Sequence, residues 1–192
     1  MKKNYEVRLE ISEGVTCKVA GNKVHFSKGG TQTDRLIDIP GAVTQVVGNE
    51  FVISSKKSNK KDIAKIRAQL AHVKNILLGL NERFVYELEV CNVHFPMTVK
   101  IDGSRLVINN FLGEKVPRSA NILSGVEVKI EGSKIKLISA DIEKAGQTAA
   151  NIEKASKVRN KDRRIFQDGI FITKKPEVIL WINNFWEETQ SN

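Results

Sequence analysis

Along the N-terminal part of the chain, apolar and polar residues alternate in short runs separated by glycine-containing turns. Alternation with a period of two is typical of β-strands that bury one face. Turns at residues 21–22 and 48–49 each join two such runs, which predicts two β-hairpins. Further breaks are expected at residues 29–30 and 40–41. The expected strands are 15–19, 23–26, 42–47 and 51–54.

The period changes near residue 62, where apolar residues begin to recur every three or four positions. The residues of this stripe are Ile63, Ile66, Leu70, Val73 and Leu77. Such spacing predicts an amphipathic helix over 62–78 that lies on a sheet. Asn59 or Asp62 is expected to cap its start, and Gly79 to end it.

The second half of the chain repeats this order. A long strand begins at Phe84, and residues 98–105 then match residues 16–23 at an offset of 82, with four of the eight positions identical or equal in charge. The turn at 132–133 follows the turn at 48–49 at an offset of 84, and a helix over 141–156 follows at an offset of 79. We infer a tandem duplication of a strand-rich unit closed by one helix. The alternative is that glycine-containing hairpins recur in any β protein.

The predicted fold class is therefore α+β, with two tandem duplicated domains, each a small, mostly antiparallel sheet system packed with one helix. The expected domains are 1–82 and 83–175, followed by an acidic amphipathic tail over 176–192. At helical spacing, one face of residues 177–188 collects Val178, Trp181, Ile182, Phe185 and Trp186, which include both tryptophans of the chain. We expect this face to dock, either on the chain's own second domain or on a neighbouring protein.

Positive charge dominates the composition. The chain has 31 Lys and Arg against 22 Asp and Glu, a formal net charge of +9. Residues 1–175 carry 31 cations and 19 acids, a charge of +12, and the remaining residues carry three acids. This balance favours a polyanionic partner, nucleic acid before membrane, because no basic amphipathic helix dominates the chain.

Several classes of protein are excluded by what the sequence lacks. Two cysteines, Cys17 and Cys91, are too few for a disulfide scaffold or a four-ligand zinc site, and we expect buried thiols in a reducing compartment. No apolar leader or membrane-length apolar run is present, which predicts a soluble intracellular protein. The three histidines lack metal-ligand spacing, and His72, beside the helix stripe, suits a flank or interface. Without a catalytic motif, no enzyme activity, metal or cofactor is expected.

Six cations and one acid occupy residues 154–164, directly after the second predicted helix. Cations on a short defined segment are typical of phosphate contacts, and Asn160 and Asp162 suit a turn between them. The alternative is a solvated helix end whose cations complement the helix dipole. A second lysine group, in an expected loop over 56–61, is explained equally well by solvation. Aromatic residues do not interleave with the basic run, which favours docking on folded RNA over stacking on single strands.

Three stretches carry a resemblance to a known family. They are residues 72–76 (HVKNI) with 94–96 (HFP), residues 110–115 (NFLGEK) and residues 157–171 (KVRNKDRRIFQDGIF). Over residues 5–175 the chain resembles the universal ribosomal protein six of the large subunit, called L-nine in eukaryotes, in its archaeal–eukaryotic branch. The last two stretches resemble signatures of that branch. The tail from Pro176 matches nothing in the family.

The resemblance implies a non-enzymatic, cytoplasmic protein of the large ribosomal subunit. Family members bind large-subunit rRNA mainly through the C-terminal domain, beside the sarcin–ricin loop and the stalk base, with ribosomal proteins as further neighbours and no small-molecule substrate. The rRNA-binding residues that it implies are Lys157, Arg159, Asn160, Lys161, Arg163, Arg164 and Lys115. Two alternatives stay open: an extra-ribosomal RNA-binding or ribosome-assembly factor with this fold, and a protein–protein adaptor.

Overall fold

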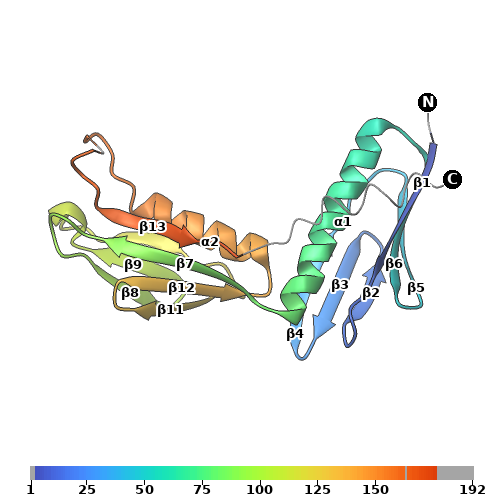
Figure 1. Ribbon diagram of the computed structural model, residues 1–192, viewed down its shortest axis with the longest axis horizontal. Helices are drawn as coiled ribbons and strands as arrows, with labels where there is room; N and C mark the ends of the chain where they lie inside the picture. The colour runs from blue at the N-terminus through green and yellow to red at the C-terminus, as the bar shows by residue number, and fades with distance from the viewer. Residues whose placement is uncertain (1–2, 163, 177–192) are drawn as a thin grey trace.

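The computed structural model describes residues 3–162 and 164–176 of the chain (Figure 1). Arg163 and the expected tail helix over 177–188 lie outside the described residues. In the described part, 13 strands form four sheets, all of whose neighbours are antiparallel, and two α-helices accompany them. This confirms the predicted α+β class.

The N-terminal half consists of two three-stranded sheets and one long helix (Figure 1). In the first sheet β6 (Glu50–Ser58) lies between β1 (Lys3–Glu10) and β5 (Ala42–Val47). The second sheet has the order β2 (Thr16–Ala20), β3 (Lys23–Lys28) and β4 (Thr31–Leu36). Helix α1 (Lys60–Asn81) packs its apolar stripe on both sheets.

The C-terminal half has the same order of elements with one strand added. Its four-stranded sheet has the order β11 (Glu127–Glu131), β12 (Lys134–Ser139), β7 (Phe84–Cys91) and β13 (Gly169–Lys174). Its three-stranded sheet has the order β10 (Arg118–Asn121), β9 (Arg105–Asn109) and β8 (Thr98–Asp102). A 3₁₀ turn, η1 (Phe111–Gly113), follows β9, and helix α2 (Ile142–Ala155) follows β12.

Several corresponding elements of the two halves share one offset, which supports the predicted duplication. Strands β8 and β9 begin 82 residues after β2 and β3. The N-caps of the helices, Asn59 and Asp141, are also 82 residues apart. Asp141 therefore corresponds to Asn59, and the expected offset of 79 between the two helices was wrong. The proposed boundary between residues 82 and 83 falls in the link between α1 and β7.

Helix α1 begins with a reciprocal capping arrangement. The Asn59 side chain accepts hydrogen bonds from the backbone N–H of Lys61 and Asp62, at 2.8 and 2.9 Å, and the Asp62 carboxylate accepts one from the Asn59 N–H at 3.1 Å. Both candidate caps thus act together. Since β6 runs to Ser58, the lysines of residues 56–61 lie at a strand end and in the first helical turn, and the expected loop was wrong.

Gly79 does not end α1, contrary to the prediction. The helix continues to Asn81, and Glu82 is its C-cap. Gly79 is buried at the place where α1 meets the C-terminal half, and a Cβ atom there would overlap the carbonyl oxygen of Ala140. The glycine permits a close approach of two backbones.

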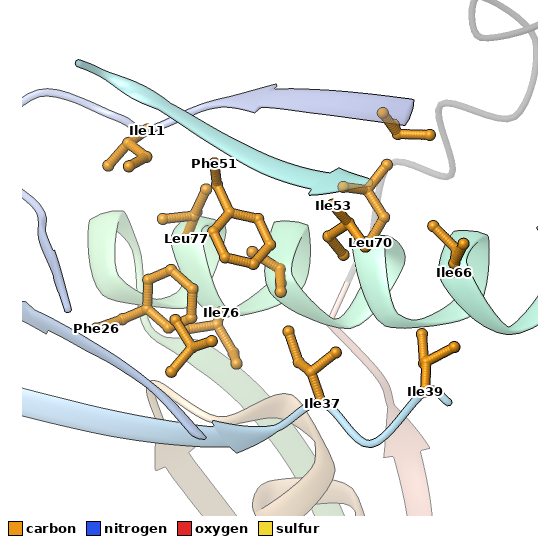
Figure 2. Close-up of a cluster of buried hydrophobic side chains, with 13 residues drawn as sticks. Ile11, Phe26, Ile37, Ile39, Phe51, Ile53, Ile66, Leu70, Ile76 and Leu77 are labelled. Carbon is orange, nitrogen blue, oxygen red and sulfur yellow. The ribbon is translucent and has the colours of Figure 1, made fainter. Parts of the chain in front are cut away.

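Each half has its own hydrophobic core. Figure 2 shows the N-terminal core, in which Ile66, Leu70 and Leu77 of α1 lie against side chains of both sheets. Phe26 and Phe51 meet edge to face there, with ring centroids 6.1 Å apart. The C-terminal core gathers Leu88, Leu106, Ile135, Leu137 and Ile152 under α2. Dense apolar packing of this kind stabilises each half separately.

The two cysteines were expected to be buried, and that was wrong. Both Cys17 and Cys91 are free thiols and only half-buried. Cys17 lies on the outer strand of a small sheet, and Cys91 at the end of β7. Even so, partial burial raises the pKa of Cys17 to about 11 and raises that of Cys91 above its ordinary value. Both thiols are therefore protonated at neutral pH.

Charged side chains also join the two halves. Arg35 of β4 donates to the Glu143 carboxylate of α2 at 2.8 and 2.9 Å, and to the side chain of Gln69 at 3.2 Å. The His72 Nδ1 atom lies 2.5 Å from Glu143 Oε1. The interface role expected of His72 is confirmed.

Candidate nucleic-acid interface

The basic run forms a loop over residues 157–168 that connects α2 with β13. It projects from the end of the C-terminal half that is remote from α1 (Figure 1). The described cations of the basic run, residues 154–164, are all exposed: Lys154, Lys157, Arg159, Lys161 and Arg164. Of these, only Lys154 lies in the last turn of α2. Complementing the helix dipole therefore accounts for one cation and leaves the others without that role.

At its start the loop is held by Ser156, the C-cap of α2. Ser156 is 1% exposed, and its hydroxyl oxygen accepts a hydrogen bond from the Ile170 N–H at 2.9 Å. Because Ile170 belongs to β13, this bond ties the end of the helix to the beginning of the strand. The two ends of the loop are thereby held together.

At its end the loop is held by Asp168, which is 3% exposed. Its carboxylate accepts hydrogen bonds from the N–H groups of Val93 and His94, at 2.8 and 3.0 Å, and lies 2.6 Å from His94 Nδ1. Burial alone would raise the pKa of Asp168, but the bonds from His94 and Val93 together hold it below the ordinary value. Asp168 therefore stays ionised, which suits an acceptor of three hydrogen bonds.

The middle of the loop is shaped by its own polar residues. Asn160 has a φ of 55°, a left-handed conformation that asparagine tolerates well. The Asp162 carboxylate accepts a bond from the Arg164 N–H at 2.9 Å, and its carbonyl accepts one from the Phe166 N–H at 2.9 Å. The expected turn at Asn160 and Asp162 is confirmed. The acid of the run is thus bonded to backbone N–H groups.

No carboxylate neutralises the loop cations in the part of the chain that the structure describes. Lys157, Arg159 and Arg164 form no salt bridge there. The Lys161 ammonium lies 4.4 Å from the ring centroid of Phe166, which stacks on His94 at 4.9 Å. Unneutralised cations on a loop that is anchored at both ends are suited to a polyanion, because the anchors lower the entropy lost on binding.

Lys115 belongs to a neighbouring turn that Arg118 connects to the basic loop. The Arg118 guanidinium makes two bonds to the Glu114 carboxylate, at 2.7 and 2.5 Å, and lies 4.1 Å from the ring centroid of buried Phe111. It also donates to the carbonyl oxygens of Ala155 and Lys157, at 3.0 and 3.1 Å. The NFLGEK stretch thus supports the start of the basic loop, and Lys115 is exposed beside that support.

Sequence reasoning missed this set of supporting residues. Asp168 was noted only within the stretch 157–171, and neither His94 nor Arg118 was linked to the basic run. The four-residue spacing of Glu114 and Arg118 is visible in the sequence, but it indicates a pair only within a helix. His94 and Asp168 are 74 positions apart, so no local pattern connects them.

A groove of about 1100 Å³ opens beside the loop, between α2, the end of β7 and β13. Phe166 and Phe171 line it together with Lys154, Lys157 and Arg159. No aromatic residue interleaves with the basic run in the sequence, but the fold brings Phe166 and Phe171 beside its cations. A groove with aromatic walls and cations at its edge offers both stacking and phosphate contacts.

Five of the seven expected rRNA-binding residues lie in the one loop: Lys157, Arg159, Asn160, Lys161 and Arg164. Lys115 lies in the neighbouring turn that Arg118 links to the start of this loop. Arg163 lies outside the described residues. Within the described ranges, no three His, Cys, Asp or Glu side chains gather as a metal site would require. None of the helices described is long and apolar enough to cross a membrane.

Comparison with known proteins identifies relatives over most of the chain. Residues 95–169 match the family model described as ribosomal protein L6. The chain is 38% identical over 172 residues to large ribosomal subunit protein uL6 of Methanococcus vannielii, covering 90% of this chain and 94% of the relative. It is 40% identical over 176 residues to that of Methanosarcina mazei (91% and 99%) and 40% over 174 residues to that of Aeropyrum pernix (90% and 94%). The similarity to archaeal proteins confirms the resemblance noted in the sequence.

Proposed function

Because the chain belongs to the uL6 family of large ribosomal subunit proteins, we propose that it is a structural constituent of that subunit and binds large-subunit rRNA through the loop 157–168. The family is one of structural proteins and not of enzymes. The proposed site is the region of the sarcin–ricin loop and the stalk base, which the family resemblance implies, with ribosomal proteins as neighbours. The rRNA-facing residues that we assign are Lys157, Arg159, Asn160, Lys161, Arg163, Arg164 and Lys115.

One observation supports this function above the others. The loop is anchored at both ends by buried polar residues, Ser156 and Asp168, yet its described cations have no carboxylate partner within the described residues. A protein that only needed solubility would not require such rigid support for its charges. Phosphates can be neutralised there with release of counterions, and docking follows the shape of folded RNA.

The salt dependence of rRNA binding tests the proposal. The double variant Arg159→Ala/Arg164→Ala should bind large-subunit rRNA more weakly, and the slope of log K against log salt should fall by about one to two, at ~0.9 or less for each phosphate that is no longer neutralised. The matched control is Lys18→Ala/Lys65→Ala, which removes two exposed cations from the N-terminal half and should keep the slope. An unchanged slope in a folded Arg159→Ala/Arg164→Ala variant contradicts the assignment.

Co-sedimentation separates a ribosomal constituent from the alternative functions. A structural constituent stays with mature large subunits after washing in high salt, because its contacts are buried in the particle. An assembly factor is found on precursor particles and leaves under the same wash. A protein–protein adaptor ignores purified rRNA at physiological salt.

A further inference from the structure

In the groove beside the basic loop, one aromatic ring is not covered by other side chains of the protein. Phe171 of β13 is 37% exposed and lines the groove. Its ring lies against the backbone of Gly169, where a Cβ atom would stand 3.0 Å from the Phe171 Cζ atom. Phe166, by contrast, has His94 stacked on its ring and the Lys161 ammonium over it. Phe171 is therefore the ring in the groove that is available to a ligand.

Helix α2 forms a wall of the groove with a small side chain and a carboxylate. Ala150, Glu153 and Lys154 are spaced three and four residues apart and so share one flank of the helix. Ala150 leaves space where a longer residue would fill the groove. Glu153 is half-buried, and its carboxylate forms no salt bridge within the described residues. The groove therefore contains a carboxylate that can accept a hydrogen bond from a ligand.

Cations surround this groove on the loop side. Lys154, Lys157 and Arg159 line it and are exposed, and no carboxylate pairs with them in the described ranges. A ligand complementary to this groove has a flat apolar face for Phe171, a hydrogen-bond donor for Glu153 and negative charges for the flanking cations. A nucleotide within an RNA strand has all three: a base face, exocyclic amino groups and phosphates.

We propose that the groove accepts one unstacked nucleotide of large-subunit rRNA, with its base on Phe171 and its flanking phosphates at Lys154, Lys157 and Arg159. Glu153 accepts a hydrogen bond from the exocyclic amine of the base, which favours adenine, cytosine or guanine over uracil. The volume of about 1100 Å³ exceeds that of a typical small-ligand site and accommodates the backbone on either side of the base. This proposal rests on the proposed rRNA binding and adds a base-specific element to it.

Chemical probing of protein-free large-subunit rRNA from Methanosarcina mazei, refolded with the full-length chain, tests the groove. Hydroxyl radicals report the footprint on the RNA backbone, dimethyl sulfate reports the base edges of adenine and cytosine, and kethoxal reports the base edge of guanine. Wild-type protein should protect a backbone region and, within it, the base edge of one unpaired nucleotide. Phe171→Ala and Ala150→Leu should restore the reactivity of that base, the first by removing the stacking surface and the second by filling the groove. Phe171→Ala should also weaken binding about tenfold, within the range that one aromatic stacking contact provides.

The outcomes distinguish this proposal from the function on which it rests. If the backbone footprint is present but the protection of no base is lost in Phe171→Ala or Ala150→Leu, the groove proposal is overturned and rRNA binding stands. If no backbone footprint forms with wild-type protein, both are overturned. Phe95→Ala is the matched control, because Phe95 is exposed in the same half and lies outside the groove lining. Equal loss of base protection in this control also overturns the proposal. Ala150→Leu alters an exposed helical position and keeps a strong helix former, so it should fold.

Discussion

Replacing Gly79 with alanine tests the contact at which the two halves meet. A Cβ atom at Gly79 would overlap the Ala140 carbonyl oxygen, and it would stand 2.9 Å from the carbonyl carbon and 2.7 Å from Cε2 of Phe84. Gly146 of α2 offers a matched control, since it too is a glycine inside a helix. There the Cβ atom would approach only the Tyr86 ring end, with the hydroxyl oxygen at 2.9 Å.

The two substitutions should change the free energy of unfolding in opposite directions or, for Gly146→Ala, hardly at all. Glycine to alanine inside a helix is intrinsically favourable by about 1 kcal/mol. Overpacking costs about 1–3 kcal/mol and sometimes more, and the upper end applies at Gly79 because a backbone carbonyl cannot rotate away as a side chain does. We therefore expect Gly79→Ala to lower the free energy of unfolding by about 2 kcal/mol. Gly146→Ala should be neutral or slightly stabilising, because the Tyr86 hydroxyl can move by a few tenths of an ångström.

Urea unfolding followed by far-ultraviolet circular dichroism measures the difference. A loss of about 2 kcal/mol lowers the midpoint by roughly 1 M urea at ordinary denaturant sensitivity. Small-angle X-ray scattering provides a second measurement, since the halves must move apart to relieve the overlap and the radius of gyration should rise. If Gly79→Ala is as stable as wild type and has the same radius of gyration, the backbone approach at this junction is refuted.

Three further predictions concern the loop anchors and the tail. Asp168→Asn should lower the free energy of unfolding by about 2 kcal/mol, because it weakens a buried charged hydrogen-bond acceptor. Folding lowers the pKa of Asp168, so the difference in Tm from wild type should be full at neutral pH and shrink as the pH falls below about 4. An equal difference at all pH values contradicts this. Arg118→Lys should speed amide hydrogen exchange in residues 157–168, since one ammonium cannot make all the hydrogen bonds of the guanidinium to Glu114 and to the carbonyl oxygens of Ala155 and Lys157. Unchanged exchange contradicts the anchoring role. Tryptophan fluorescence reports the environment of the tail, which contains Trp181 and Trp186. A blue-shifted spectrum in the isolated protein indicates that the tail docks on the chain itself, and a blue shift only in the ribosome indicates docking on a partner. A spectrum of exposed tryptophan in both states refutes docking.

Much of the fold was predictable because its signals are local. Alternation over 42–47 coincides with β5, and the turns at 21–22 and 48–49 lie in the hairpins as expected. The apolar stripe predicted α1 because residues three and four apart share one face of a helix. The offset of 82 between two hairpins likewise required only comparison of the chain with itself.

The errors in the fold prediction occurred where distant parts of the chain meet. Gly79 has the residue type of a helix end, but Ala140 decides its role through close backbone contact. The lysines of residues 56–61 suit a loop, but β6 extends to Ser58 by pairing with β1, and α1 begins at Lys60. Residue type alone could not distinguish these cases.

Net charge and the basic run were sufficient, with the family resemblance, to predict a ribosomal protein and to single out the segment that we propose binds rRNA. The geometry of that segment depends on tertiary structure alone. His94 and Asp168 are 74 positions apart, Arg118 and Lys157 are 39 apart, and Phe171 reaches the groove from an edge strand. Periodicity and turn chemistry act over a few residues, whereas buried hydrogen bonds and aromatic contacts form only after the sheets have brought distant segments together. The sequence therefore determined which residues carry the charge, and the packing of α2, β7 and β13 decided how that charge is held and what lies beside it.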